Sequence, residues 1–164
     1  MPLFQLILVA VIQGVTEFLP VSSSGHLILL PNLTGLEDQG QVIDVAVHVG
    51  TLLAVMLYFW ADVRIAIGGL PRALAGKTDT EGSRLALLLM VASVPVVALG
   101  LVLHMTGLDV EMRSIAVIGW AMLAFGIVLY WADQAGPTVK TNRDWNLQDA
   151  MVMGVWQAVA LIPG

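Results

Sequence analysis

A carboxylate, three adjacent hydroxyls and an imidazole lie between residues 17 and 26 of this chain. Glu17 comes just before Pro20, and the run Ser22-Ser23-Ser24-Gly25-His26 follows that proline. Polar and ionisable side chains are costly next to lipid, so in a strongly apolar chain they usually face a protein interior or a water-filled cavity. These residues are therefore the first candidates for a functional site.

The residue types in this cluster fit the transfer of a phosphoryl group. Residues before a proline avoid the α region, so we expect one helix to end near Pro20 and one of the three serines to cap a new helix. Hydroxyls and free backbone N–H groups at a helix N-terminus form an anion site suited to phosphate. Gly25 would let the backbone approach a ligand closely.

The titratable groups supply the rest of such a site. His26 can act as a general acid or base. Glu17 can orient that histidine, activate a serine or a water, or hold a divalent cation, because Mg²⁺ binds phosphates through one or two carboxylates. Gln13 lies four residues before Glu17, so the two share a helix face. Phosphoryl transfer also uses a basic group on the developing charge, and the first basic residue is Arg64.

The composition predicts an integral membrane protein. The 164 residues are 58% hydrophobic and 12% charged, with a mean hydropathy of +0.87, whereas soluble domains average about 25% charged residues. A net charge of −5 without any basic run argues against nucleic acid as a partner. The absence of cysteine excludes disulfides, thiolate chemistry and cysteine-based metal sites.

Five apolar segments define the expected elements. They are residues 3–19, 43–60, 85–104, 114–131 and 147–163. A helix needs about 20 residues to cross the hydrocarbon core, and the second, third and fourth segments fit that length. The first and last contain polar residues and end in proline, so we predict short or re-entrant helices there. The expected fold is an all-α bundle of transmembrane helices with short re-entrant helices.

An internal echo predicts an inverted repeat. The segment Ile12-Gln13-Gly14-Val15, followed by Pro20, resembles Trp156-Gln157-Ala158-Val159, followed by Pro163. Two interrupted segments in corresponding places are the sequence signature of inverted-repeat membrane folds, in which the site lies at the repeat interface.

The distribution of basic residues predicts an orientation. The connections 61–84 and 132–146 hold most of them, which the positive-inside rule places in the cytoplasm. The connections 27–42 and 105–113 are then outside, and the serine cluster faces the external side.

The other histidines and the flanking serines have simpler interpretations. His48 lies four residues after Asp44, which favours a structural hydrogen bond within one helix over a role in the site. His104 ends an apolar segment and is typical of a helix C-terminus. Ser22 and Ser24, taken singly, are typical of helix caps.

Residues 13–26 resemble the first signature of the undecaprenyl-diphosphatase family, the bacitracin-resistance membrane phosphatases of bacteria. Residues 44–54 and 157–164 resemble two further stretches of that family. In the family, the last stretch continues into a Ser-Arg-Ser-Gly sequence that supplies an arginine. Family chains are longer, so the resemblance implies that residues 1–164 are the N-terminal portion of a single membrane domain.

The resemblance implies an activity and a setting. The family removes the terminal phosphate of undecaprenyl diphosphate, with dependence on Mg²⁺ or Ca²⁺, and so recycles the lipid carrier of cell-wall synthesis and confers bacitracin resistance. It implies a multi-pass protein of the bacterial inner membrane whose site faces the periplasm. Its partners are the lipid bilayer and a polyprenyl diphosphate.

The same resemblance assigns roles to residues. Glu17 would be an essential carboxylate and the candidate metal ligand, Ser23 a nucleophile or phosphate ligand, and His26 the acid/base partner. Gln13 stands where some members have a second glutamate. The substrate-binding candidates are Gln13, Ser22, Ser24 and Gly25.

Several alternatives stay open at this stage. A lipid-phosphate transporter or flippase would use the same broken helices without breaking a bond, and an inactive fragment would bind the lipid without turnover. The oligomeric state is also open, and a homo-oligomer is one possibility. So is the choice between a covalent phosphoserine and direct attack by water.

Overall fold

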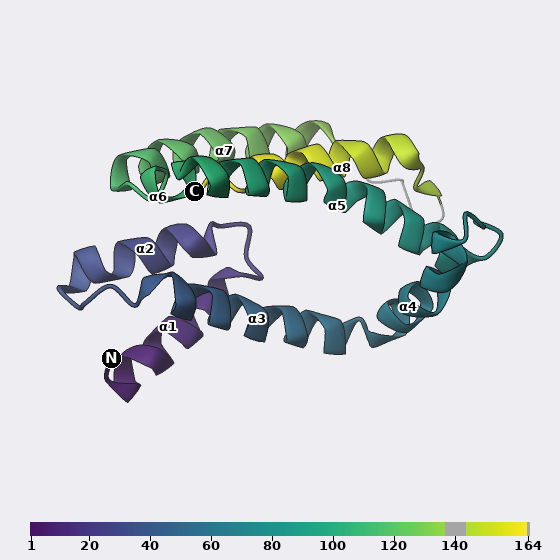
Figure 1. The fold of residues 1–164 in the computed structure, drawn as a ribbon. Helices are drawn as coiled ribbons and strands as arrows, with labels where there is room; N and C mark the ends of the chain where they lie inside the picture. Colours follow the sequence, from purple (N-terminus) through teal and green to yellow (C-terminus); the bar gives the residue numbers. More distant parts are fainter. Residues whose placement is uncertain (137–143, 164) are drawn as a thin grey trace. The chain divides into compact units, whose positions relative to one another are not determined.

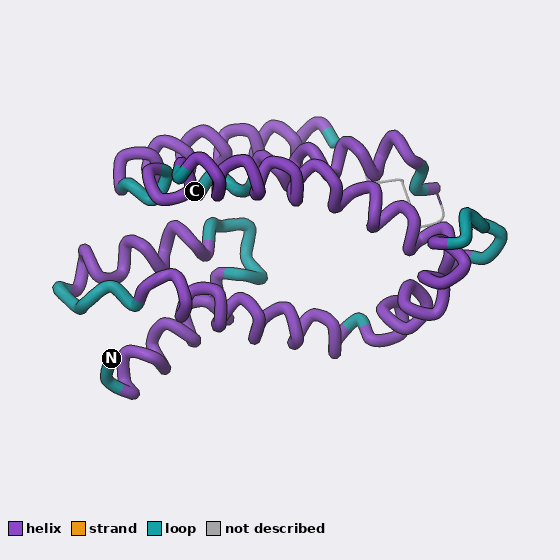
Figure 2. The backbone as a smooth tube through the Cα atoms, viewed as in Figure 1, coloured by secondary structure: helices purple, strands orange, loops and turns teal. Residues whose placement is uncertain are grey.

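A computed structural model describes residues 1–136 and 144–163, and every regular element in those residues is a helix (Figure 2). The helices are α1 Leu3–Thr16, α2 Ser23–Thr34, α3 Gly40–Tyr58, α4 Trp60–Leu74, α5 Glu81–Thr106, α6 Leu108–Glu111, α7 Ile115–Ala135 and α8 Leu147–Val159 (Figure 1). The predicted all-α class is confirmed.

Three helices are long and apolar enough to cross a membrane among the residues that the structure describes. They are α3, α5 and α7, which confirms the prediction for the second, third and fourth apolar segments. Few of their side chains are buried against other residues of the chain. Apolar surface of that extent fits helices in contact with lipid or with further protein.

The first and last apolar segments form the short helices α1 and α8, of 14 and 13 residues. Neither reaches the length of about 20 residues needed to cross the hydrocarbon core alone. Each ends four residues before a proline, α1 at Thr16 before Pro20 and α8 at Val159 before Pro163. The local echo in the sequence therefore corresponds to matching helix ends, while the inverted repeat stays a prediction.

Two connections that we expected to be loops contain helices. Residues 27–42 include most of α2, because Ser22 caps that helix and Gly35, with a φ of 70°, ends it only after Thr34. Residues 61–84 include most of α4, which carries Arg64 and Arg72 yet packs against α5. We expected residues 61–84 to be a connection because they contain basic residues. Enough apolar and small residues lie between these to give α4 a face that packs against another helix.

The chain divides into two compact units, which are described separately. The first is built mainly from Met1–Val55 and Val110–Ala135, and the second from Met56–Asp109 together with α8. In the first unit, α2 packs on α1 and α7. Its fully buried side chains include Val9 of α1, Leu27 of α2 and Ile118 of α7.

In the second unit, α5 packs along both α4 and α8 (Figure 1). Leu88 and Ala92 of α5 form a buried cluster with Ala150 of α8. Helices α5 and α8 each begin with a capping box, formed by Thr80 and Ser83 for α5 and by Asn146 and Asp149 for α8. These caps satisfy N–H groups that have no partner within a helix.

Candidate functional site

The polar face predicted for the first helix is present in the first unit, where Gln13 is buried and Glu17 is exposed. Gln13 is fully buried. Its Nε2 donates to Oε2 of Glu17 at 2.9 Å and to Oγ1 of Thr51, on α3, at 3.3 Å. The amide therefore fixes the carboxylate of Glu17 and ties the end of α1 to α3.

The serine run begins helix α2 as predicted. Ser22 is the N-cap, and its Oγ accepts from the backbone N–H of Gly25 at 3.1 Å. Ser23 is then the first residue of the helix and is buried. The first N–H groups of a helix lack intrahelical partners, so those of Ser23 and Ser24 are free to bind an anion.

Ser23 and Glu17 are brought together by the turn between α1 and α2. The hydroxyl of Ser23 donates to Oε2 of Glu17 at 2.6 Å. A hydrogen bond from a hydroxyl to a carboxylate at that distance is of the strong, charge-assisted kind. Oε2 thus accepts two hydrogen bonds, one from Ser23 and one from Gln13.

His26 lies on the first turn of α2, where its Nδ1 is 2.6 Å from the carbonyl oxygen of Ser22. A carbonyl only accepts, so Nδ1 carries the proton of the neutral ring. Among the described residues, no hydrogen bond or ion pair joins His26 to Glu17 or Ser23. The structure therefore holds His26 beside the helix N-terminus and apart from the carboxylate–hydroxyl pair.

His48 of α3 lies beside Ser23 and Glu17, which was not predicted from the sequence. Its Nδ1 is 2.7 Å from the carbonyl oxygen of Asp44, which is the expected bond within the helix. Its Nε2 lies 3.5 Å from Oγ of Ser23 and 3.8 Å from Oε2 of Glu17. The signal available in the sequence was the spacing of His48 and Thr51, two polar residues on one face of an apolar helix.

A polar network behind the site anchors α3. Gln39 donates from Nε2 to the carbonyl oxygen of Leu27 at 3.0 Å and to Oδ1 of Asp44 at 2.8 Å. Arg113 donates from Nη2 to Oδ2 of Asp44 at 2.9 Å. The network joins the first part of α3 to α2 and to the connection before α7. The carboxylate of Asp44 forms an ion pair with Arg113.

Gly25 lies where α2 meets α7. A Cβ at this position would stand 3.2 Å from Oγ of Ser22, 3.3 Å from Sδ of Met122 and 3.4 Å from Cγ2 of Ile118. Close packing of α2 on α7 is thus one reason for a glycine here. Its predicted contact with a ligand stays a prediction, as do the ligand contacts of Ser22 and Ser24.

A divalent cation at this site would require several oxygen ligands. The described residues contain no group of three His, Asp or Glu side chains that could enclose an ion. Glu17 offers one carboxylate, and Oε1 of Gln13 is buried without a hydrogen-bond partner. Mg²⁺ in phosphate sites is held by one or two carboxylates together with substrate phosphates and water, so these residues fit an ion that the substrate completes.

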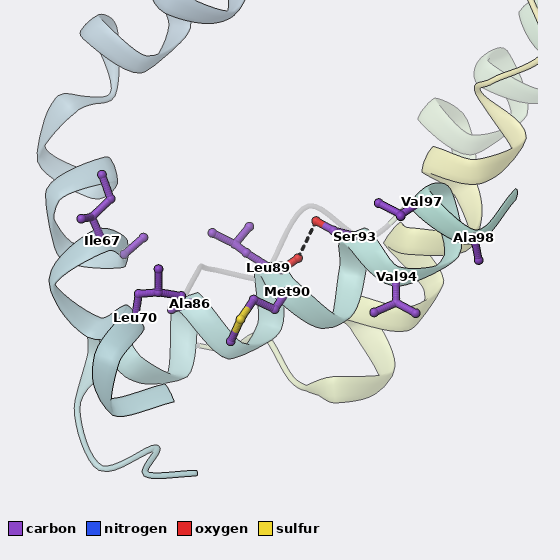
Figure 3. Close-up of a pocket in the computed structure, with 10 residues that line it drawn as sticks. Ile67, Leu70, Ala86, Leu89, Met90, Ser93, Val94, Val97 and Ala98 are labelled. Atoms are coloured by element: carbon purple, nitrogen blue, oxygen red, sulfur yellow. Dashed lines mark hydrogen bonds between the residues drawn. The ribbon is translucent and has the colours of Figure 1, made fainter. Parts of the chain in front are cut away.

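A groove in the second unit lies between α4 and α5 and has a volume of about 610 Å³ (Figure 3). Its walls include Ile67 and Leu70 of α4 and Leu89, Val94 and Val97 of α5. The hydroxyl of Ser93, drawn in Figure 3, donates to the carbonyl oxygen of Leu89 at 2.9 Å. The groove is apolar and offers no group for chemistry.

The fold and this cluster define an all-helical membrane protein with a carboxylate, a hydroxyl and an imidazole at a helix N-terminus. Residues 6–164 match the family described as Bacitracin resistance protein BacA. The chain therefore belongs to that family.

Curated relatives carry a functional name. Undecaprenyl-diphosphatase of Ruegeria pomeroyi is 69% identical to this chain over 164 residues, and that of Jannaschia sp. is 66% identical over the same length. Undecaprenyl-diphosphatase 1 of Pseudoalteromonas translucida is 41% identical over 164 residues. In each case the match covers 100% of this chain and 61% of the relative. No solved structure matches the chain.

Proposed function

We propose that the protein to which this chain belongs is an integral membrane phosphatase that hydrolyses undecaprenyl diphosphate to undecaprenyl phosphate and inorganic phosphate. The observation that carries the proposal is the 2.6 Å hydrogen bond from Ser23 to Glu17 at the start of α2. It combines a hydroxyl, a carboxylate and a helix N-terminus, which are the parts that phosphoryl transfer uses. The printed names of the relatives agree with it.

In the proposed reaction, the diphosphate binds at the N-terminus of α2, against the free N–H groups of Ser23 and Ser24. The Ser23 oxygen, or a water beside it, attacks the terminal phosphorus, and the bond from that phosphorus to the bridging oxygen breaks, which releases undecaprenyl phosphate. If Ser23 is the attacking group, a water then hydrolyses the phosphoserine and releases inorganic phosphate. Glu17 already accepts the hydrogen bond of Ser23 and is placed to take its proton. His26, on the same turn, is the candidate acid for the leaving oxygen in its doubly protonated form, because the neutral ring carries its one proton on Nδ1, toward Ser22.

Glu17 would hold the divalent cation that the family resemblance implies, and the Nε2 group of Gln13 would keep its carboxylate in place. Such an ion neutralises charge on the phosphate oxygens when bound. The prenyl tail would remain among the apolar helices, so that only the headgroup enters the site. The arginine expected for the developing charge belongs, on the family resemblance, to sequence after residue 164.

The proposed setting is the bacterial inner membrane, with the site on the external side. Support comes from the basic residues of 61–84, which favour a cytoplasmic position for that connection. There the protein would return the lipid carrier to cell-wall synthesis, and a supply of monophosphate would counter bacitracin.

The test measures inorganic phosphate released from undecaprenyl diphosphate by the full-length protein in detergent, where no transmembrane gradient exists. We expect turnover by the wild type, and a loss of at least about a hundredfold in Glu17→Gln with the folded protein retained. The matched control is Glu111→Gln, at an exposed carboxylate, which we expect to leave the rate unchanged. Near-normal turnover in Glu17→Gln would refute the proposed mechanism, and a folded wild type without turnover would favour transport or binding alone.

A further inference from the structure

His48 is an ionisable side chain at the site for which the proposed mechanism has no role. It comes from α3, whereas Glu17 and Ser23 come from the turn between α1 and α2. Its Nε2 lies 3.5 Å from Oγ of Ser23. The imidazole therefore approaches the same hydroxyl as the Glu17 carboxylate, from a different helix.

The bond on the other side of the ring determines what Nε2 can do. Nδ1 is 2.7 Å from the carbonyl oxygen of Asp44, and a carbonyl only accepts. The neutral ring must therefore carry its proton on Nδ1, which leaves a lone pair on Nε2 directed at Ser23. Nε2 is thus a hydrogen-bond acceptor.

The hydroxyl of Ser23 has one proton and two acceptors. Oε2 of Glu17 lies at 2.6 Å and Nε2 of His48 at 3.5 Å. Hydrogen bonds in sites without substrate are often long and tighten when the substrate binds. The single hydroxyl proton can therefore point toward Glu17 or toward His48, and these two acceptors limit the orientations of the hydroxyl.

The position of His48 is itself fixed from behind. Asp44, one turn earlier on α3, accepts from Gln39 at 2.8 Å and from Arg113 at 2.9 Å. These contacts hold the backbone that carries the accepting carbonyl. The ring orientation is thus set by a bond within α3, which the contacts of Asp44 support, and does not depend on Ser23.

We propose that His48 is a positioning residue, whose Nε2 is a second acceptor for the Ser23 proton beside Glu17 and so limits the orientations of that hydroxyl for attack on the diphosphate. The proposal rests on the proposed function in assigning the attacking group to Ser23. It requires no change in the protonation of His48. If the acceptor at Nε2 is what matters, another side chain that places an acceptor in the same position should replace the imidazole.

The kinetic test uses His48→Leu and His48→Gln in the full-length protein in detergent, with undecaprenyl diphosphate as substrate. We expect His48→Leu to lower kcat about tenfold, the value of one hydrogen bond, with little change in KM. His48→Gln places an amide group near the position of Nε2 and should recover most of the loss. The control is His104→Leu, at a histidine whose side chain is 81% exposed in the other unit.

Two kinetic results would overturn the proposal. In one, His48→Leu is as active as the wild type. In the other, His48→Gln is as impaired as His48→Leu, which indicates that the shape of the ring matters and its acceptor does not.

A second measurement does not depend on turnover. We expect the ¹⁵N spectrum of the His48 imidazole, in the full-length protein without substrate, to give the tautomer with the proton on Nδ1. The Nε2 resonance should shift in Ser23→Ala and stay in place in Ser24→Ala. The opposite tautomer, or no response to Ser23→Ala, overturns the positioning role even in an active enzyme. A wild type that releases no phosphate refutes the proposed function, and the spectrum still decides whether His48 holds Ser23.

Discussion

Arg113 and Asp44 form an ion pair that joins two parts of the first unit 69 positions apart in the sequence. Nη2 of Arg113 lies 2.9 Å from Oδ2 of Asp44, and the side chains are 28% and 11% exposed. Removal of one partner from such a pair leaves the other charge poorly solvated, which costs more than the pair contributes. The pair therefore supports α3 at the residue whose carbonyl orients His48.

We expect Arg113→Gln or Asp44→Asn alone to lower the free energy of unfolding by about 2 kcal/mol, because each leaves a partly buried charge without its partner. The double variant should be less destabilised than the sum of the two. Denaturation of the full-length protein in detergent measures all three. Additive losses would contradict a direct interaction, and Arg72→Gln, at an exposed pair, is the control.

The three long apolar helices, the end of α1 and the start of α2 could be predicted from the sequence, whereas α4 and most of α2 were expected to be loops. Apolar runs of sufficient length identified α3, α5 and α7, the four-residue spacing put Gln13 and Glu17 on one face, and a serine at the start of α2 acts as the predicted cap. Each of these features depends on residues close together in the chain.

The contacts between helices could not be predicted in the same way. His48 has a satisfactory partner within its own helix, the carbonyl oxygen of Asp44, so local spacing gave no reason to place its other nitrogen at Ser23. Likewise, nothing close to Arg113 in the sequence indicates that it pairs with Asp44. Both contacts depend on the packing of segments that are distant in the sequence, which local spacing does not reveal.

Ser22→Ala removes the side-chain cap of α2. We expect a loss of about 1 kcal/mol in stability and faster hydrogen exchange at the amide of Gly25, which loses its acceptor. The first turn of α2 carries Ser23, so phosphate release should also fall severalfold. Ser24→Ala, which leaves the cap intact, should retain slow exchange at Gly25. Equal exchange in the wild type and Ser22→Ala would show that the cap contributes little.

Removal of divalent cations should stop phosphate release by the full-length protein, and Mg²⁺ should restore it. The reason is that the proposed mechanism has Glu17 hold a divalent cation whose other ligands are substrate phosphates and water. Binding of Mn²⁺ in the presence of inorganic pyrophosphate, followed by electron paramagnetic resonance, should weaken in Glu17→Gln and not in Glu111→Gln. Turnover that persists in excess chelator would rule out a cation in the reaction.

Asp79 and Arg72 form an exposed pair at the end of α4, outside the candidate spans. The hydrogen bonds from Arg72 hold the pKa of Asp79 below its ordinary value of 3.8. A lowered pKa in the folded state means that the pair stabilises the fold above pH 3.8, and the contribution is lost as the pH falls through the folded pKa. A ¹³C titration of the carboxyl should show this shift.

The control for that titration is Arg72→Gln, which should return the pKa of Asp79 toward its ordinary value. The effect on stability should be small, because surface ion pairs are screened by solvent. An unchanged pKa in Arg72→Gln would assign the shift to another group.

Gly154 allows α8 to lie directly against α5. A Cβ at this position would stand 2.5 Å from the carbonyl oxygen of Ala92 and 3.0 Å from Cγ of Pro95. Because the first contact is with backbone, no side-chain rotation can relieve it, and α8 must move away from the cluster of Leu88, Ala92 and Ala150. We expect Gly154→Ala to lower the free energy of unfolding by about 1–3 kcal/mol.

The matched control is Gly68→Ala, on α4 of the same unit, where a Cβ would meet nothing within 4 Å. Alanine is favoured over glycine in a helix by about 1 kcal/mol, so this variant should be neutral or more stable. Denaturation of both variants in detergent separates helix propensity from helix packing. If Gly154→Ala were as stable as Gly68→Ala, α8 could not lie as close to Ala92 as the structure places it.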